Sequence, residues 1–538
     1  MWFYGGVAVE MESMGDRRKS VAVLWALLLC LGWSCWPAGR VQAADTVAAL
    51  RTKPRDSRVS VERILASSRY SGPDAWQMLT PSQMAYAYAS DLTGVALRYQ
   101  YDQRNKLLRF DQGCGGHQGV FHAHSYLHLR RNLTVYGMAS YTYGRIRGVQ
   151  WMNSSDLQET YPYISATLEG GEGIRSTYRF MGGVDYGFSF GTLGVAVRYR
   201  AMQYHRTRDP RPRNIVSDFN LSFGYSVPLG KTYSLGLVGR LRVYKQSSSV
   251  SIYNPQSEPE YFLFKGLGSV FRRKDVSDSP ILYRLRGGGG VLQLRPVGGA
   301  GFWARALFDY ARLERLAVYA NVAPVNHYLR PYWLASFGYC QTLQGWELGA
   351  ALQADGEVRQ GYDHILGGSG IKEYKDLLAV PNYTAARYGG RLLLGAEYKS
   401  LGGVAYSAHG DVVREQLNTP FKEVRTAYLT QQLQGYYRAA LGVHSLRVGG
   451  MVALGMPLSA LYRFNVPLAS TRGAAMDYVR HNAAIRNYRQ IGGSLEVVGL
   501  LAVRQFCVLE LGLSGGVTVW PQGAITEYRG GCSLSMLF

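Results

Sequence analysis

Residues 232–244 read TYSLGLVGRLRVY, and this stretch decides the fold of the chain. Its side chains fall into two alternating sets. One set is apolar and comprises Tyr233, Leu235, Leu237, Leu241 and Val243, whereas the other comprises Thr232, Ser234, Arg240 and Arg242. Strict alternation is the pattern of a β-strand with one apolar and one polar face. A length of about ten residues is what a strand needs to cross a membrane, so the stretch predicts a membrane-spanning strand.

Similar segments recur from Leu92 to Phe538, and we count eighteen of them. The connections between them alternate in length along the chain: the long ones hold 8–36 residues and the short ones 2–6. Bacterial outer-membrane barrels join their strands by short periplasmic turns and longer external loops. We therefore predict an all-β fold, a transmembrane antiparallel β-barrel of about 18 strands (16–18).

Composition agrees with a barrel and excludes several other classes of protein. The 538 residues include 64 glycines and 40 tyrosines, and 18% are charged, against about 25% in a typical soluble domain. Apolar runs after residue 44 are far shorter than the ~18 residues of a membrane helix. Hydrophobic residues make up 47%, too many for a disordered chain. A large soluble sandwich or propeller also has alternating strands, and it stays as the alternative fold.

The N-terminus has the features of an export signal. A basic cluster, Arg17-Arg18-Lys19, precedes an apolar run from Val21 to Leu31, and residues 41–43 offer a cleavage site. This order is that of a secretory signal peptide. We assign residues 1–43 to the signal peptide, 44–91 to an N-terminal periplasmic or plug segment, and 92–538 to the barrel. In fatty-acid-channel-like barrels such a segment plugs the lumen, and the alternative is a loose periplasmic tail.

The C-terminal segment, residues 527–538, ends the chain on an aromatic residue. Tyr528, Gly530, Cys532, Leu534, Met536 and Phe538 share one face. This pattern resembles the C-terminal insertion signal of outer-membrane barrels, in which Tyr528, Leu534, Met536 and Phe538 would be read by the barrel assembly machinery. In its loops and its glycine- and tyrosine-rich strands, the chain resembles the uncharacterised outer-membrane β-barrel proteins of the Bacteroidetes. The resemblance implies an outer-membrane location in a Gram-negative bacterium.

Arginine is the most informative charged residue. The chain has 48 arginines and 11 lysines, and its net charge is +22. By strand parity we expect eight arginines to face the lumen: Arg179, Arg198, Arg200, Arg240, Arg242, Arg284, Arg286 and Arg305. Rings of arginine favour anions in pores. Charge in the external loops, such as Arg272-Arg273-Lys274, is expected to contact lipopolysaccharide, and an exported chain is not expected to bind nucleic acid.

Histidines cluster on one predicted strand, where His122, His124 and His128 share the lumen face. The spacing of His122 and His124 can chelate zinc or copper, and a single histidine can hold haem. The simpler interpretation is that polar lumen positions tolerate histidine, so we expect no cofactor. Ser407, His409 and Asp411 have the residue types of a hydrolytic triad, but same-face neighbours on a strand stand ~7 Å apart, so we do not expect an enzyme.

Two cysteines, Cys507 and Cys532, lie on the last two predicted strands with lipid-face parity. We expect them to be cross-strand neighbours and yet free thiols, because a disulfide between directly paired strands is strained.

The sequence thus favours a non-enzymatic, porin-like outer-membrane barrel that is a channel or uptake component for a small solute, and the lumen arginines would favour an anionic one. The alternative is a barrel that anchors or assists a surface assembly or secretion machine. Besides a solute, we expect the protein to contact outer-membrane lipid and lipopolysaccharide.

Overall fold

The protein is described by a computed structural model. It describes residues 80–86, 91–254, 256, 261–273, 280–297, 300–318, 322–367, 375–399, 401–464, 474–504 and 507–538. The predicted signal peptide and most of the predicted 44–91 segment lie outside these residues, as does Lys274 of the basic loop.

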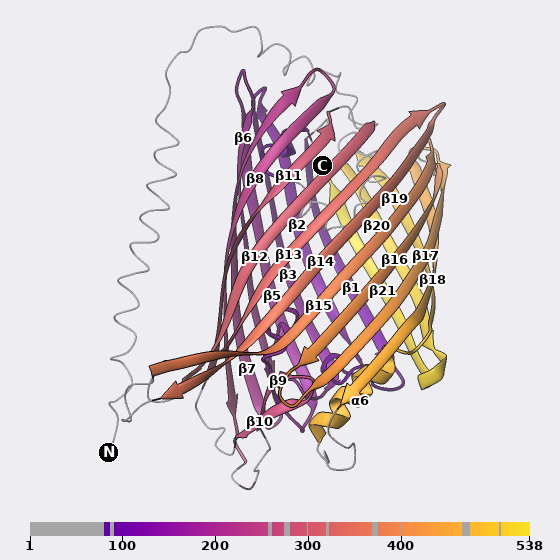
Figure 1. Cartoon of the computed structure of the whole chain (residues 1–538). Helices are drawn as coiled ribbons and strands as arrows, with labels where there is room; N and C mark the ends of the chain where they lie inside the picture. The colour runs from indigo at the N-terminus through magenta and orange to yellow at the C-terminus, as the bar shows by residue number, and fades with distance from the viewer. Residues whose placement is uncertain are drawn as a thin grey trace, which may run out of the picture.

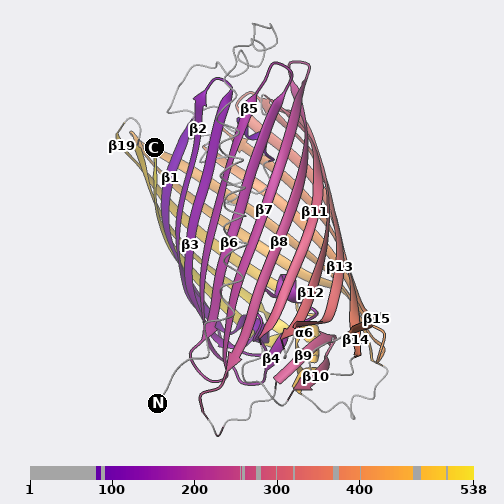
Figure 2. The same ribbon diagram turned by 90° about the vertical axis from the view of Figure 1, so that its left-hand side faces the viewer.

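Eighteen antiparallel strands form one closed barrel (Figures 1 and 2). Each strand pairs with the next along the chain, and the first pairs with the last, so the sheet has no open edge. Closure excludes the sandwich and the propeller. The strands are β1 (Leu92–Arg104), β2 (Gly115–Arg130), β3 (Leu133–Val149), β5 (Gly171–Gly187), β6 (Thr192–Arg206), β7 (Arg211–Leu229), β8 (Tyr233–Ser251), β11 (Ile281–Pro296), β12 (Gly301–Val318), β13 (Val322–Leu343), β14 (Trp346–Gly367), β15 (Lys375–Tyr398), β16 (Gly402–Leu417), β17 (Lys422–Leu441), β18 (His444–Phe464), β19 (Gln490–Arg504), β20 (Cys507–Trp520) and β21 (Ile525–Leu537).

The outer wall of the barrel is apolar. Large side chains that are exposed there include Leu97, Phe223, Leu237, Leu241, Phe337, Leu352, Leu433, Leu495 and Leu513. In a soluble protein so broad an apolar surface would promote aggregation, whereas in a bilayer it contacts lipid tails. The barrel is therefore an outer-membrane protein. Among the described residues, no helix has the length and apolarity to cross a membrane.

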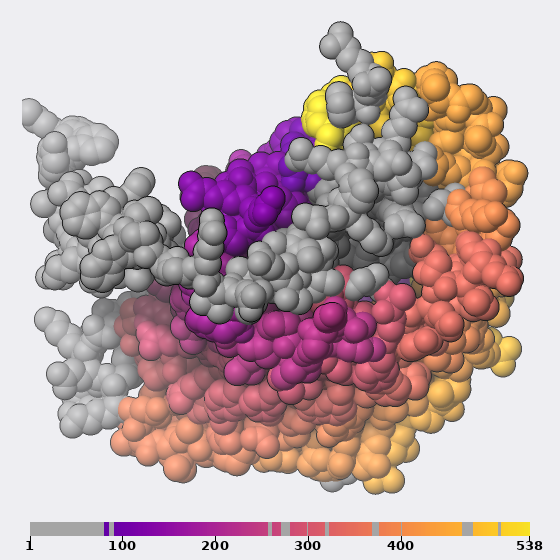
Figure 3. All heavy atoms as spheres, turned by 90° about the horizontal axis from the view of Figure 1, so that it is seen from above, coloured from indigo at the N-terminus to yellow at the C-terminus, as the bar shows by residue number. Residues whose placement is uncertain are grey.

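The strands are longer than the bilayer requires. Their lengths run from 13 residues in β1 to 24 in β15, against the ~9–11 that cross the hydrocarbon layer. The surplus extends the wall beyond the membrane at the end that carries the long loops, which is the external end of such barrels. Seen from the opposite end, the coloured strands follow one another around the barrel (Figure 3).

A second, small sheet lies at the external end. It consists of β4 (Ser165–Thr167), β9 (Tyr261–Gly266) and β10 (Ser269–Arg273), in the order β10-β9-β4. A short helix, α5 (Leu157–Thr160), and a longer one, α6 (Ala474–Ile485), accompany it. Figures 1 and 2 both place β9, β10 and α6 at the same end of the barrel. We call residues 150–168, the β9–β10 hairpin and α6 the cap.

The expected neighbourhood of the two cysteines is wrong. In the observed register Cys532 lies opposite Leu513, and Val508 lies opposite Leu537, so the two cysteines are several positions apart along the β20–β21 pair. Both are free thiols. Trp520 lies opposite Ile525, so the hairpin is centred between Gln522 and Gly523, and the two cysteines are not equidistant from that centre.

Candidate functional site: a basic lumen closed by the cap

Six of the eight arginines predicted for the lumen lie on inward-facing positions of their strands. Each alternates with outward apolar residues and shares its face with buried lumen residues; the six are Arg179, Arg198, Arg200, Arg240, Arg242 and Arg305. Arg240 pairs with Asp309 at 3.2 Å. Arg198, Arg240 and Arg305 are close enough to repel one another electrostatically. The middle of the lumen is therefore basic along the wall formed by β5 to β12.

Arg284 and Arg286 face outward, so the parity prediction is wrong for these two residues. They are exposed, whereas their neighbours Tyr283 and Leu285 are fully buried inside the barrel. The sequence misleads here because polarity inverts near the external end. There the inner face of the wall packs against the cap and is apolar. The outer face lies beyond the lipid tails and is polar.

The opposite side of the lumen is open to water. Arg98, Arg387 and Arg391 are inward-facing and exposed, and so are Gln434 and Glu496. Arg387 pairs with Asp411 at 2.8 Å, but Arg98 and Arg391 make no ion pair with any residue that the structure describes. Exposed charged side chains inside a closed sheet require water around them. The barrel therefore encloses a wet chamber along β1 and β14–β21.

The cap crosses the lumen from wall to wall. On β6, the buried Arg206 donates to Asn153 at 2.6 Å and to the Glu169 carbonyl at 2.7 Å. On β12, Arg315 donates to the Phe264 carbonyl at 3.0 Å. On β17, Lys422 donates to the Leu267 carbonyl at 3.1 Å.

The α6 end of the cap is also anchored. Arg486, just beyond the helix, pairs with Glu415 of β16 at 3.1 Å, and Tyr462 of β18 donates to the Ala483 carbonyl at 2.8 Å. Aromatic residues fill the space between these anchors, since Trp151, Phe264 and Tyr478 pack together from three segments of the cap. The external mouth is therefore closed.

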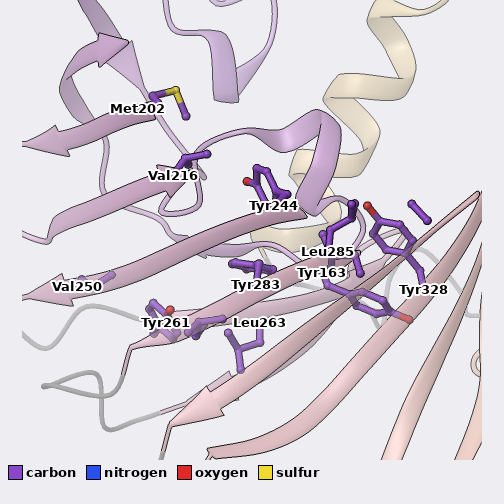
Figure 4. Close-up of a cluster of buried hydrophobic side chains, with 13 residues drawn as sticks. Tyr163, Met202, Val216, Tyr244, Val250, Tyr261, Leu263, Tyr283, Leu285 and Tyr328 are labelled. Atoms are coloured by element: carbon purple, nitrogen blue, oxygen red, sulfur yellow. The ribbon is translucent and has the colours of Figure 1, made fainter. Parts of the chain in front are cut away.

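Cap side chains pack directly on the inner wall. Tyr163, Tyr261 and Leu263 of the cap join wall residues such as Tyr283 and Leu285 in one buried cluster (Figure 4). Tyrosine hydroxyls in this region are hydrogen-bonded, as between Tyr283 and Ser154 at 3.0 Å.

Ionic contacts hold α5 at the centre of the cap. Asp156 pairs with Arg200 at 2.5 Å, and Glu159 pairs with Arg242 at 3.0 Å and with Arg330 at 2.9 Å. Burial alone would raise the pKa of the Glu159 carboxyl, but Arg330 and Arg242 outweigh burial and bring this pKa to about 2. Both loop carboxylates thus neutralise lumen arginines.

A second segment enters the lumen nearer the periplasmic end. Residues 80–86 lie against the inner faces of β5–β8, where the backbone nitrogens of Ser82 and Ala85 donate to Asp185 at 2.9 and 3.0 Å. Ser226 donates to the Ser82 carbonyl at 2.8 Å, and Tyr126 donates to the Met84 carbonyl at 2.7 Å. We call residues 80–86 the inner segment.

The three histidines predicted for the lumen, His122, His124 and His128, do not converge. The rings of His122 and His124 are 5.3 Å apart, but His128 turns away to Asp91, with Nδ1 and Oδ1 3.0 Å apart. The described part of the chain contains no group of three or more His, Cys, Asp or Glu side chains that could hold a metal ion. His409 and Asp411 are 2.8 Å apart, and no described hydrogen bond joins His409 to Ser407.

Sequence reasoning missed the acidic residues of the cap. Asp156 and Glu159 lie in a non-periodic stretch, SSDLQET at residues 154–160, between two aromatic residues, Trp151 and Tyr163. Aromatic residues in an external loop of a barrel are a signal that the loop packs inward rather than into solvent. Arg330 and Arg359 were also missed, although both share the parity of other lumen residues.

Solved structures with similar folds are outer-membrane proteins and receptors. The ferric preacinetobactin receptor BauA from Acinetobacter baumannii is 7% identical, with 82% of this chain and 80% of that chain covered and a TM-score of 0.35. The outer membrane transporter YddB from Escherichia coli is 9% identical, with 82% and 80% covered and a TM-score of 0.34. The outer membrane protein opdK from Pseudomonas aeruginosa is 12% identical, with 84% and 99% covered and a TM-score of 0.33.

Among curated proteins, none matches this chain. A sequence model described as a family of unknown function, DUF6850, matches residues 81–533, which include the inner segment from its second residue and nearly the whole barrel.

Proposed function

The chain belongs to the family of unknown function DUF6850, and from the chemistry of its lumen we propose that it is an outer-membrane uptake channel for small anionic solutes. One observation carries the proposal: the chamber behind the cap is wet and lined by exposed arginines, of which Arg98 and Arg391 make no ion pair with a described residue. A barrel with a purely structural role would have no need to keep such charges hydrated at its centre.

Arginine supports anion passage for two physical reasons. Its guanidinium group stays charged at any physiological pH and binds carboxylate or phosphate through paired hydrogen bonds. Charges within the Debye length of about 8 Å also act on a passing ion with little screening. In this proposal the cap and the inner segment are closures that move aside for the solute.

Ion selectivity tests the proposed function. Currents through the wild-type barrel are recorded in planar bilayers under a salt gradient. The potential at which the current is zero should have the sign that indicates preferential anion permeation. Replacing Arg98 and Arg391 by glutamine should reduce that potential severalfold at low salt and much less at high salt, since salt screens the lost charges. Cation-selective wild-type openings would reject the proposal.

An alternative function is that of an anchor for a surface assembly or secretion machine. The observation that favours it is the cap, which presents a folded sheet and a helix at the external surface. Such a barrel would stay closed, and the same recordings would show no openings.

We also propose that the outer wall binds phosphates of lipopolysaccharide through an outward basic patch: Lys245, Arg284, Arg286 and Arg312 of β8, β11 and β12. Arg286 lies opposite Arg312, and Arg284 lies opposite Lys245. Like charges directly opposite one another are destabilising unless an anion lies between them. Glu314 supplies one such anion, since it pairs with Arg312 at 3.1 Å, and no other acidic residue that the structure describes pairs with this patch.

The triple variant R284Q/R286Q/R312Q should therefore carry markedly less lipopolysaccharide than wild type when both are purified in mild detergent. Native mass spectrometry counts the bound lipid. Dephosphorylated lipopolysaccharide is the control, since it should bind both proteins equally weakly. Equal retention of phosphorylated lipopolysaccharide by the variant and by wild type would contradict the assignment.

A further inference from the structure

The cap places two carboxylates among arginines of the lumen wall. Arg200 of β6, Arg242 of β8 and Arg330 of β13 converge on α5, and we call these three residues the arginine cage. The cage is built on three separate strands of a closed sheet, so its geometry does not depend on the cap. It would remain in place if the cap moved.

The wall supplies part of the charge balance of the cage. Asp218 of β7 accepts from Arg200 at 3.2 Å and from Arg242 at 2.9 Å, and so holds both guanidinium groups in position. With Asp218 alone, three positive charges face one negative charge. Asp156 and Glu159 supply the two missing charges from the cap, and the closed cage is neutral.

The cage side chains are largely withdrawn from water in the closed barrel. The side chains of Arg200, Arg242 and Arg330 are 19%, 22% and 14% exposed, and those of Asp156 and Glu159 are 16% and 15% exposed. A buried cation whose partner is removed must recruit another anion or water. Withdrawing α5 therefore leaves a site with a net charge of +2, and this site requires an anion.

Backbone contacts also hold α5 in place. Tyr328 donates to the Glu159 carbonyl at 2.5 Å, and Arg359 donates to the carbonyls of Gln158 and Tyr161 at 2.7 and 2.8 Å. If α5 moved away, these donors would lose their acceptors, just as the arginines of the cage would. They add further groups suited to the oxygen atoms of an anion.

We propose that the arginine cage is the solute-binding site and that Asp156 and Glu159 occupy it as built-in competitors, which a small molecule with two anionic groups displaces. This inference rests on the proposed function and specifies its solute class: compounds that present carboxylate or phosphate oxygens to two or three guanidinium groups. Displacement of the carboxylates frees α5 and, with it, the centre of the cap. The solute thus opens the mouth through which it enters.

The pKa of Glu159 agrees with a ligand-driven rather than an acid-driven opening. Because this pKa is held near 2, the ionic contact is fully formed above the ordinary range of a carboxyl and is lost only as the pH falls toward 2. Acidification within the physiological range therefore leaves Glu159 ionised, and only a competing anion can take its place.

Binding in detergent solution tests the inference without requiring conductance. Succinate and, separately, inorganic phosphate are titrated calorimetrically into the folded barrel. The variant D156N/E159Q removes the competing charges but keeps side-chain size, and it should bind at least one probe about tenfold more tightly than wild type does. Adding R242Q and R330Q to that variant should abolish the binding.

The matched control is D209N/E172Q. It also removes two negative charges, but from carboxylates outside the cage, which pair with Arg211 at 2.8 Å and with Arg145 at 3.4 Å. It should bind both probes as wild type does. Heat-modifiable gel migration checks that every variant is folded.

The outcomes separate this inference from the proposed function. If folded D156N/E159Q binds neither probe more tightly than wild type and the control do, the cage is not the solute site, and the inference is overturned even if the barrel conducts anions. If D156N/E159Q binds a probe more tightly than wild type and the control do, and the cage variant loses that binding, the inference stands, whatever the ion selectivity of the pore.

Discussion

Replacing Gly194 by leucine is expected to expel the inner segment from the lumen. A Cβ atom at Gly194 would overlap the backbone nitrogen of Ser82 and crowd the Asp185 carboxylate, which it would meet at 2.6 Å. Backbone atoms of a strand cannot yield to such an overlap, so the inner segment must move. Its two hydrogen bonds to Asp185 are then lost, at about 1.5–3 kcal/mol each.

Cysteine labelling measures the effect. Ser82 is fully buried, so a cysteine introduced there should react slowly with a water-soluble maleimide in a background where the four native cysteines of the barrel are serine. Adding Gly194→Leu should speed labelling about a hundredfold, the factor that corresponds to about 3 kcal/mol.

The control for this experiment is Gly239→Leu. A Cβ atom at Gly239 meets nothing within 4 Å, and the residue lies on the outer face beside Leu237 and Leu241. Its labelling rate should match the parent. A folded Gly194→Leu protein that reacts as slowly as the control would show that the inner segment is not held where the structure has it.

Deleting Phe538 is expected to lower the amount of folded barrel severalfold. Phe538 exchanges two backbone hydrogen bonds with Thr93, at 2.8 and 3.3 Å, and these complete the seam between β21 and β1. Its ring is half-exposed on the outer face, with Met536 and Leu534 on the same face of β21. The deletion therefore weakens the seam and also removes the terminal aromatic residue of the proposed signal for the barrel assembly machinery.

Two substitutions separate the two causes. Phe538→Ala keeps the backbone contacts and removes the ring, whereas Phe538→Tyr keeps both. Outer-membrane fractions are compared by heat-modifiable migration: Phe538→Tyr should assemble normally and Phe538→Ala poorly. Normal assembly of the deletion variant would contradict a role for the terminal residue.

Strand periodicity predicts the barrel because the same rule applies at every position of a membrane-spanning strand. An outward side chain meets lipid and an inward one meets water, so the alternation in TYSLGLVGRLRVY reports the two faces directly. The rule holds for Arg198, Arg200, Arg240 and Arg242. It fails for Arg284 and Arg286 because neither condition applies beyond the membrane, where the cap lines the inside.

The cap was beyond sequence reasoning for a different reason. Its contacts join residues that lie far apart in the chain, such as Arg486 with Glu415 and Arg315 with the Phe264 carbonyl. No local periodicity marks them. The arginine cage is a mixed case, since parity predicts Arg200 and Arg242, whereas their partners Asp156 and Glu159 come from a loop without a repeating pattern.

The central claim is that a passage for anions runs through this barrel and is closed by the cap and the inner segment. It is tested most directly by the zero-current potential of the combined variant G194L/D156N/E159Q in a planar bilayer under a potassium chloride gradient. The account predicts sustained conductance and a potential of the sign for chloride permeation, where wild type conducts only in brief openings. A folded combined variant that passes no current, or that favours potassium, would contradict it.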